Sequence, residues 1–161
     1  MTSPLEDAVL YAIPIAVFKP YLTKYTAVLD YFLENFATNI HRFHVPEVHD
    51  LFAPILFNLI QNGNTILREA VSKCIVEILI HQHDLERRSV LVKQVINDLA
   101  EAGAFTMRKC FLNLCRFGAG KFTRQFFLEN FYKSFLAMAK DKVPHVRIDF
   151  AKSLIDIKPW F

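Results

Sequence analysis

The feature of this sequence that most constrains its fold is an arginine that returns at nearly constant spacing. Arg68, Arg108 and Arg147 are 40 and 39 residues apart. A period of about 40 residues is typical of repeat proteins in which each unit is a helical hairpin. We therefore expect an array of similar units rather than a compact bundle of unrelated helices.

Apolar residues recur at fixed offsets from each of these arginines. The offsets lie sixteen, twelve, nine and one residue before the arginine, and three and seven residues after it. Around the first arginine they hold Phe52, Leu56, Leu59, Leu67, Val71 and Ile75. Steps of three, four and seven residues place side chains on one face of a helix. The pattern therefore predicts one helix before each arginine and a second helix after it.

The predicted fold is all-α, an α-solenoid of about four helical hairpins with eight helices. The repeats cover approximately residues 5–41, 46–83, 84–120 and 123–159. The first repeat is degenerate, because Val28 occupies its arginine position. A hairpin of this size cannot bury both of its apolar faces alone, so packing between neighbours supplies the core. No polar capping helix follows the apolar residues near Trp160, and we expect the segment to belong to a longer array.

Turn-forming residues separate the two helices of each predicted hairpin. In the second repeat they are Asn62, Gly63 and Asn64. The third repeat turns at residues 102–104, and the fourth turns at residues 140–144. Glycine and asparagine interrupt helical patterns and favour tight turns. All three turns are therefore expected at corresponding places in their repeats.

Composition excludes disorder and argues against a membrane or secreted protein. The chain has 161 residues, of which 53% are hydrophobic and 22% are charged. Its longest apolar run, residues 8–18, contains Pro14 and is shorter than the roughly 20 residues that span a bilayer. Cys74, Cys110 and Cys115 fall within apolar helical patterns, so we expect them to be reduced and buried. The expected location is the cytoplasm.

No motif in the chain predicts catalysis, a cofactor or a metal site. The string at residues 118–123, Gly-Ala-Gly-Lys-Phe-Thr, lacks the spacing of a phosphate-binding loop, and we interpret it as a turn between repeats. Two histidine pairs occur, His41 with His44 and His81 with His83. Neither pair is joined by further ligands at metal-binding spacing, so we interpret them as residues at helix ends. The chain is predicted not to be an enzyme.

Charge is unevenly divided between the two halves of the chain. Residues 1–80 carry 5 basic and 8 acidic residues, and residues 81–161 carry 14 basic and 8 acidic residues. A basic half can indicate an acidic partner or a nucleic acid. The basic residues are scattered rather than clustered, which makes nucleic acid the less favoured partner.

The fourth repeat carries the clearest resemblance to a known family. Its pattern residues are Phe135, Leu136, Met138, Lys140, Asp141, Val143, Pro144, Val146, Arg147, Ala151, Leu154 and Ile157. This order resembles the HEAT-repeat consensus. The family's proline, fourteen residues before the arginine, is present as Pro54 and is replaced by Gln94 and Lys133 in the next two repeats. Within the HEAT family, the repeat looks most like the scaffold subunit of protein phosphatase 2A and the regulatory subunits of protein phosphatase 4.

The resemblance implies a non-catalytic scaffold or regulatory subunit of such a serine/threonine phosphatase, with the catalytic subunit as its partner. In that family the turns inside the repeats form a contact ridge. The matching positions here are Asn62, Asn64, Lys140, Asp141, Lys142 and His145. Arg68, Arg108, Arg147 and Pro54 are expected to be structural residues of the repeat. The alternative is a HEAT-type nuclear transport, coat-adaptor or nucleic-acid-associated scaffold that uses the basic second half.

One departure from the family pattern concerns the aspartate of the turn. It is present as Asp141 in the fourth repeat, but Asn62 and Ala102 occupy its place in the second and third repeats. A continuous ladder of aspartate and arginine across the repeats is therefore not expected. Arg68 and Arg108 must find other partners or face water.

Overall fold

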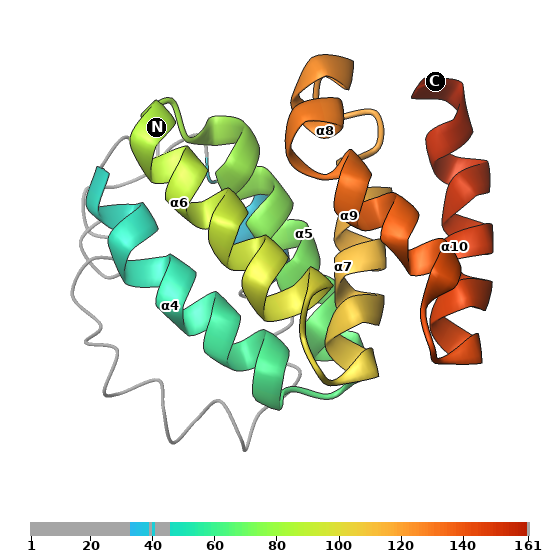
Figure 1. The fold of residues 1–161 in the computed structure, drawn as a ribbon. Coiled ribbons are helices and arrows are strands. Elements are labelled where there is room, and N and C mark those ends of the chain that lie inside the picture. The colour runs from blue at the N-terminus through green and yellow to red at the C-terminus, as the bar shows by residue number, and fades with distance from the viewer. Residues whose placement is uncertain (1–32, 39, 41–45, 161) are drawn as a thin grey trace.

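A computed structural model describes residues 33–38, 40 and 46–160 of the chain (Figure 1). Most of the first predicted repeat, including Val28, lies outside these residues, as do His41 and His44. Residues 33–38 are helical. Within the described part of the chain there is no strand, which confirms the all-α prediction there.

The remaining described elements are helices joined by short turns. In chain order they are α4 (Pro46–Asn62), α5 (Thr65–His81), α6 (Leu85–Val95), the π-helical segment η2 (Ile96–Ala100), α7 (Phe105–Gly118), α8 (Arg124–Asn130), α9 (Tyr132–Ala137), the 3-10 segment η3 (Met138–Lys140), α10 (Pro144–Ile157) and the 3-10 segment η4 (Lys158–Trp160).

Polar residues begin three of these helices. The side chain of Asn64 accepts a hydrogen bond from the backbone N–H of Leu67 at the start of α5. Asp84 caps α6 and Thr123 caps α8 in the same way. Each cap satisfies backbone donors that have no partner within the helix. The local sequence therefore determines where these helices begin.

The helices form two layers. The second helices of the hairpins, α5, α7 and α10, follow one another, with α5 packed on α7 and α7 packed on α10 (Figure 1). The core lies between this layer and the first helices. Buried residues at the predicted offsets include Leu56, Leu67, Val71, Ile75, Val92, Leu99, Met107, Phe111, Phe131, Phe135, Val146 and Phe150. The apolar register read from the sequence thus matches the core at these positions, whereas Leu154, seven residues after Arg147, is 39% exposed.

The first helices of the third and fourth repeats are less regular than the pattern predicts. In the third repeat, α6 passes into the wider turns of η2. In the fourth repeat, Phe131 separates α8 from α9 with φ −118° and ψ −24°. The ring of Phe131 is fully buried, and its centroid lies 5.7 Å from those of Phe122 and Phe126. Burial of this ring in an aromatic cluster is favourable, and it offsets the cost of interrupting the regular helix at Phe131.

Candidate functional site: the turn ridge

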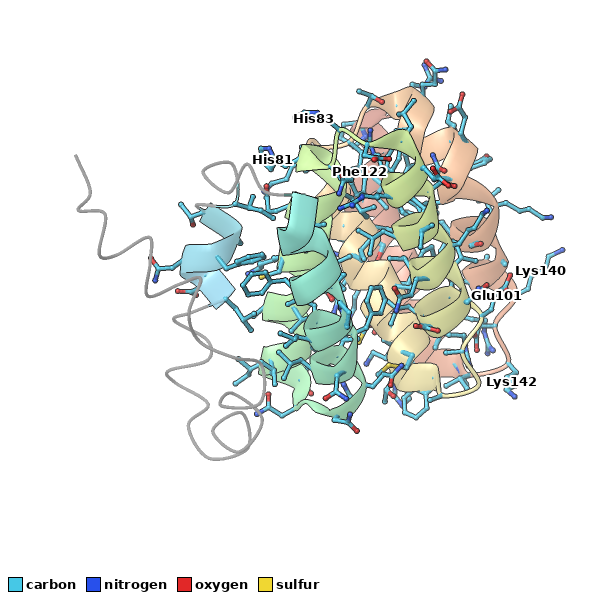
Figure 2. The ribbon with its side chains drawn as sticks, turned by 90° about the vertical axis from the view of Figure 1, so that its left-hand side faces the viewer. His81, His83, Glu101, Phe122, Lys140 and Lys142 are labelled. Carbon is cyan, nitrogen blue, oxygen red and sulfur yellow. The ribbon has the colours of Figure 1, made fainter. Side chains whose placement is uncertain are left out.

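The three turns inside the hairpins lie along one edge of the molecule, the lower edge in Figure 1. We call this edge the turn ridge and define it as residues 62–66, 101–105 and 140–145. Figure 2 shows Glu101, Lys140 and Lys142 at this end, whereas His81 and His83 lie at the opposite end. The ridge brings together residues that are about 40 positions apart in the sequence.

The repeated arginines donate hydrogen bonds to backbone carbonyl oxygens at or next to the ridge turns. Arg68 donates from Nε to the carbonyl oxygen of Ile60 at 2.9 Å and from Nη2 to that of Gln61 at 3.0 Å. Arg147 donates from Nη1 to the carbonyl oxygen of Asp141 at 2.6 Å. The last carbonyl groups of a helix have no intrahelical donor, so a guanidinium group that reaches them fixes the turn that follows.

Arg108 performs the same task and also joins two hairpins. Its Nη1 donates to the carbonyl oxygens of Ala102 and Gly103 at 2.7 and 2.9 Å. Its Nε and Nη2 bind the two carboxylate oxygens of Asp141, in the next turn, at 2.5 and 3.0 Å. The two side chains are only 8% and 7% exposed. This bidentate pair is therefore shielded from solvent and locks neighbouring turns together.

The environment of Asp141 stabilises its ionised form. The hydrogen bonds from Arg108 are the main reason that its pKa lies below the ordinary value of 3.8, and they outweigh the effect of burial. The backbone N–H of Val143 also donates to the carboxylate, at 2.8 Å. Asp141 is therefore charged at neutral pH and forms part of the framework of the turn.

The sequence left open whether Arg68 and Arg108 meet other partners or water. Both have partners in the structure, but of different kinds. Arg108 binds a carboxylate, whereas Arg68 binds only carbonyl oxygens among the described residues. The aspartate–arginine ladder is thus interrupted at Arg68, as predicted, but the expectation that Arg108 needs another partner is wrong, because it reaches the turn aspartate of the next repeat.

The predicted contact residues differ in how much they offer to a partner. Lys140, Lys142 and His145 are exposed. Asn62 and Asn64 are exposed too, but Asn62 donates to the Asn58 carbonyl oxygen at 3.0 Å and Asn64 caps α5. The carboxylate of Asp141 is bound to Arg108, so we do not retain Asp141 as a contact residue. Burial and ion pairing account for that change.

Apolar ridge residues were missed at the sequence level. Ile66 is 66% exposed and Phe105 is 41% exposed. Pro144, which has the corresponding position in the fourth repeat, is exposed as well. They occupy the first turn of α5, α7 and α10. Their sequence position could have indicated this exposure. Each is an apolar residue two or three positions before a repeated arginine, and none occupies an offset that is predicted to face the core. These residues give the ridge an apolar row beside its lysines.

Gly63 allows the first ridge turn to be tight. A Cβ atom at this position would lie 2.6 Å from the carbonyl oxygen of Leu59 and 2.7 Å from Cδ2 of Leu67. The backbone N–H of Gly63 donates to the same carbonyl oxygen at 2.7 Å. Any side chain would therefore force the two helices apart at the ridge.

The three cysteines are free and buried, as predicted. Burial raises the pKa of the Cys74 thiol to about 12, and its Sγ donates to the carbonyl oxygen of Leu33 at 3.3 Å. Burial likewise raises the pKa of Cys110 and Cys115. A thiol that stays protonated is a poor nucleophile, so these groups act as core residues.

The remaining sequence-level candidates lie in ordinary structural settings. Residues 119–123 form the turn after α7, and Gly120 adopts φ 80° there. Across the described part of the chain, no three potential ligand side chains converge as a metal site would require. In the described part of the chain, no helix is long and apolar enough to cross a bilayer.

Comparison with known proteins supports the resemblance at low identity. The chain is 22% identical over 127 residues to the human protein serine/threonine-protein phosphatase 4 regulatory subunit 4, and 21% identical to the mouse protein of that name. The match covers 78% of this chain but only 14% of the length of either relative. No family profile matches the chain, and no solved structure matches it. The chain is thus similar, at low identity, to part of a protein of that name.

Proposed function

We propose that this chain is a non-catalytic, HEAT-type solenoid segment that serves as a scaffold or regulatory module for a protein phosphatase of the 4 or 2A type. The observation that carries this proposal is the turn ridge, together with the similarity to regulatory subunit 4. We place this role in the cytoplasm, which stays a prediction from the sequence.

The ridge has the properties of a protein-contact surface. Its backbone is held by the repeated arginines, so a partner meets a preorganised edge and loses less entropy on binding. Exposed Ile66 and Phe105 supply apolar contacts, and Lys140 and Lys142 supply positive charge. Apolar residues beside charges are typical of interfaces with a specific partner. The partner surface is therefore expected to combine apolar and acidic residues.

The basic second half offers weaker support for the alternative, a nucleic-acid or transport scaffold. Several of its basic residues pair with carboxylates, since Lys109 lies 3.1 Å from Asp149 and Arg116 lies 2.6 Å from Asp156. Lys121 is paired with Glu77. Nucleic-acid binding needs cations that are free to neutralise phosphates. The pairing of these three side chains favours a protein partner.

The test measures binding of the purified chain to the purified catalytic subunit of protein phosphatase 4 by biolayer interferometry. Reversing both ridge charges, Lys140→Glu with Lys142→Glu, is expected to weaken binding by about tenfold or more. The matched control is Lys152→Glu, because Lys152 is exposed on α10 but lies away from the turns. Far-ultraviolet circular dichroism confirms that each variant is folded.

Two outcomes would contradict the proposal. Absence of binding by the unaltered chain would remove the catalytic subunit as its partner. An equal loss in Lys152→Glu and in the ridge variant would show that overall charge, rather than the ridge, determines binding. Binding to duplex DNA that falls steeply with salt would instead support the alternative scaffold.

A further inference from the structure

A groove lies between α6 and α8, at the end of the molecule opposite the turn ridge (Figure 1). It contains a cavity of about 300 Å³. Leu85, Arg88 and Val92 line it from α6, and Phe126 and Glu129 line it from α8. This volume is at the small end of ligand sites, so it suits one or two side chains rather than a whole helix.

The broken first helix of the fourth repeat leaves this groove open. Below the break, α9 packs on η2 of the preceding repeat. Above it, Arg88 of α6 reaches the Phe126 ring of α8, and the groove lies beside this contact. The buried ring of Phe131 holds the break in place. The groove is therefore a consequence of the aromatic core and not of a mobile segment.

Arg88 is the basic residue among those that line the groove. Its guanidinium carbon lies 4.0 Å from the centroid of the Phe126 ring, in a cation–π contact. Its Nε is buried, and it meets no hydrogen-bond acceptor among the described residues. Buried N–H groups in folded proteins nearly always have an acceptor. The buried Nε itself is closed to solvent, so the terminal nitrogens of the same guanidinium are the donors that an acceptor in the groove can reach.

The nearby carboxylates are occupied elsewhere. Glu129 accepts a hydrogen bond from Nε2 of Gln125 at 2.8 Å. Asp84 pairs with Arg87 at 3.8 Å and caps the start of α6. Burial lowers the pKa of Arg88, which reflects the cost of its poorly compensated charge. Glu129 keeps its negative charge, because the Gln125 amide is neutral, so an added carboxylate would be favoured beside Arg88 and disfavoured beside Glu129.

We propose that the α6–α8 groove binds a peptide segment of a partner protein in which an aspartate or glutamate stands beside a bulky aliphatic residue. The carboxylate binds the two Nη atoms of Arg88, because a planar guanidinium presents parallel donors that match a carboxylate. The aliphatic side chain packs against Val92 and Phe126, and Leu85, which is 78% exposed, covers it at the mouth.

This site is independent of the proposed phosphatase role. The ridge and the groove lie at opposite ends of the helices, so loss of one interaction leaves the other measurable. The carboxylate and apolar requirements come from Arg88 and its neighbours alone.

The test follows the Arg88 Nε–Hε signal of the ¹⁵N-labelled chain by NMR during titration with an end-blocked peptide, Gly-Leu-Glu-Leu-Gly. We expect this signal to shift together with the backbone signals of α6 and α8. The matched peptide Gly-Leu-Gln-Leu-Gly should bind about tenfold more weakly, because its side chain is uncharged. Arg88→Gln should weaken binding of the acidic peptide by about the same factor.

Arg124→Gln is the matched control, since Arg124 is an exposed arginine at the start of α8 that does not line the cavity. It should leave binding unchanged. The inference is overturned if the acidic peptide causes no shifts in the groove, if both peptides bind equally well, or if Arg124→Gln has the same effect as Arg88→Gln. Shifts confined to the ridge would also overturn it.

Discussion

The two interfaces between second helices differ although the same repeat pattern builds both. Between α7 and α10, a buried bidentate pair joins Arg108 to Asp141. Between α5 and α7, Arg68 has the same place in the register but binds only the carbonyl oxygens of its own hairpin. The residue at the turn of the following repeat, Asp141 or Ala102, accounts for this difference.

The comparison separates two tasks of the repeated arginine. Binding carbonyl groups between the two helices of its own hairpin, at the end of the first helix for Arg68 and in the turn for Arg108 and Arg147, occurs at all three positions. Joining the next hairpin requires an acid at the neighbouring turn. The α7–α10 interface adds two exposed pairs, Lys109 with Asp149 and Arg116 with Asp156, whereas the second and third repeats are joined by Glu77 of α5 and Lys121 after α7. The third and fourth repeats are thus held by charge as well as by apolar packing.

The largest expected effect comes from Asp141→Ala, which gives the α7–α10 interface the alanine found at Ala102. Arg108 would keep its carbonyl contacts but lose its counter-ion in a buried site. We expect the free energy of unfolding to fall by about 3–5 kcal/mol. Urea denaturation followed by circular dichroism measures this loss. Asp156→Ala, which removes an exposed carboxylate, is the control and should cost less than about 1 kcal/mol.

Acid should weaken the same interface in part. The pKa of Asp141 is lower in the folded chain than its ordinary value of 3.8, so its pairing contributes stability at neutral pH. That contribution is lost as the pH falls below about 4 and through the folded pKa. Unfolding free energies of the unaltered chain and of Asp141→Asn should therefore converge in acid. A difference that stays constant from neutral pH to pH 3 would refute this assignment.

The reverse exchange, Ala102→Asp, should make the α5–α7 interface resemble its neighbour. An acid at this half-buried turn position offers Arg68 the partner that Asp141 offers Arg108. We expect a gain in stability of about 1 kcal/mol, since a charged hydrogen bond is offset by desolvation. A double-mutant cycle with Arg68→Met tests the pairing. If the gain persists without the arginine, the register comparison between the two interfaces is wrong.

The smallest effects are expected at the exposed pairs. Lys109 and Arg116 are 40% and 45% exposed, so water and salt screen their interactions with Asp149 and Asp156. Lys109→Ala and Arg116→Ala should each cost less than about 1 kcal/mol, and this cost should shrink at high salt. Thermal denaturation at two salt concentrations measures it. A large, salt-independent loss would mean that these pairs contribute through packing.

Much of the fold followed from periodicity. The offsets around Arg68 predicted which residues are buried, because a helical face that repeats in register must pack on its neighbours. The position of the first turn followed from Gly63 and its flanking asparagines. The break at Phe131 was not predictable, since it depends on aromatic partners from α7 and from the turn before α8. Local propensity contains no information about those contacts.

Some residues of the candidate sites could be placed from the sequence, and others could be found only from the structure. Lys140, Lys142 and His145 could be placed on the ridge because turn residues in a repeat array share an edge. The exposure of Ile66 and Phe105 needed the structure, because an apolar residue in the first turn of a helix can face either the core or solvent. Arg88 carried no sequence signal, since its unsatisfied Nε depends on its position over Phe126.

The sequence by itself determined the repeat length, the helical hairpins and the core-facing register, because these depend on residue types at short and regular spacing. Only the tertiary structure decided which arginine meets a carboxylate, where the first helices bend and which groove stays open. The pairing of Arg108 with Asp141 and the contact of Arg88 with Phe126 join groups that are more than 30 residues apart, and the break at Phe131 depends on Phe111 of the preceding hairpin. Such groups come into contact only when neighbouring hairpins pack together.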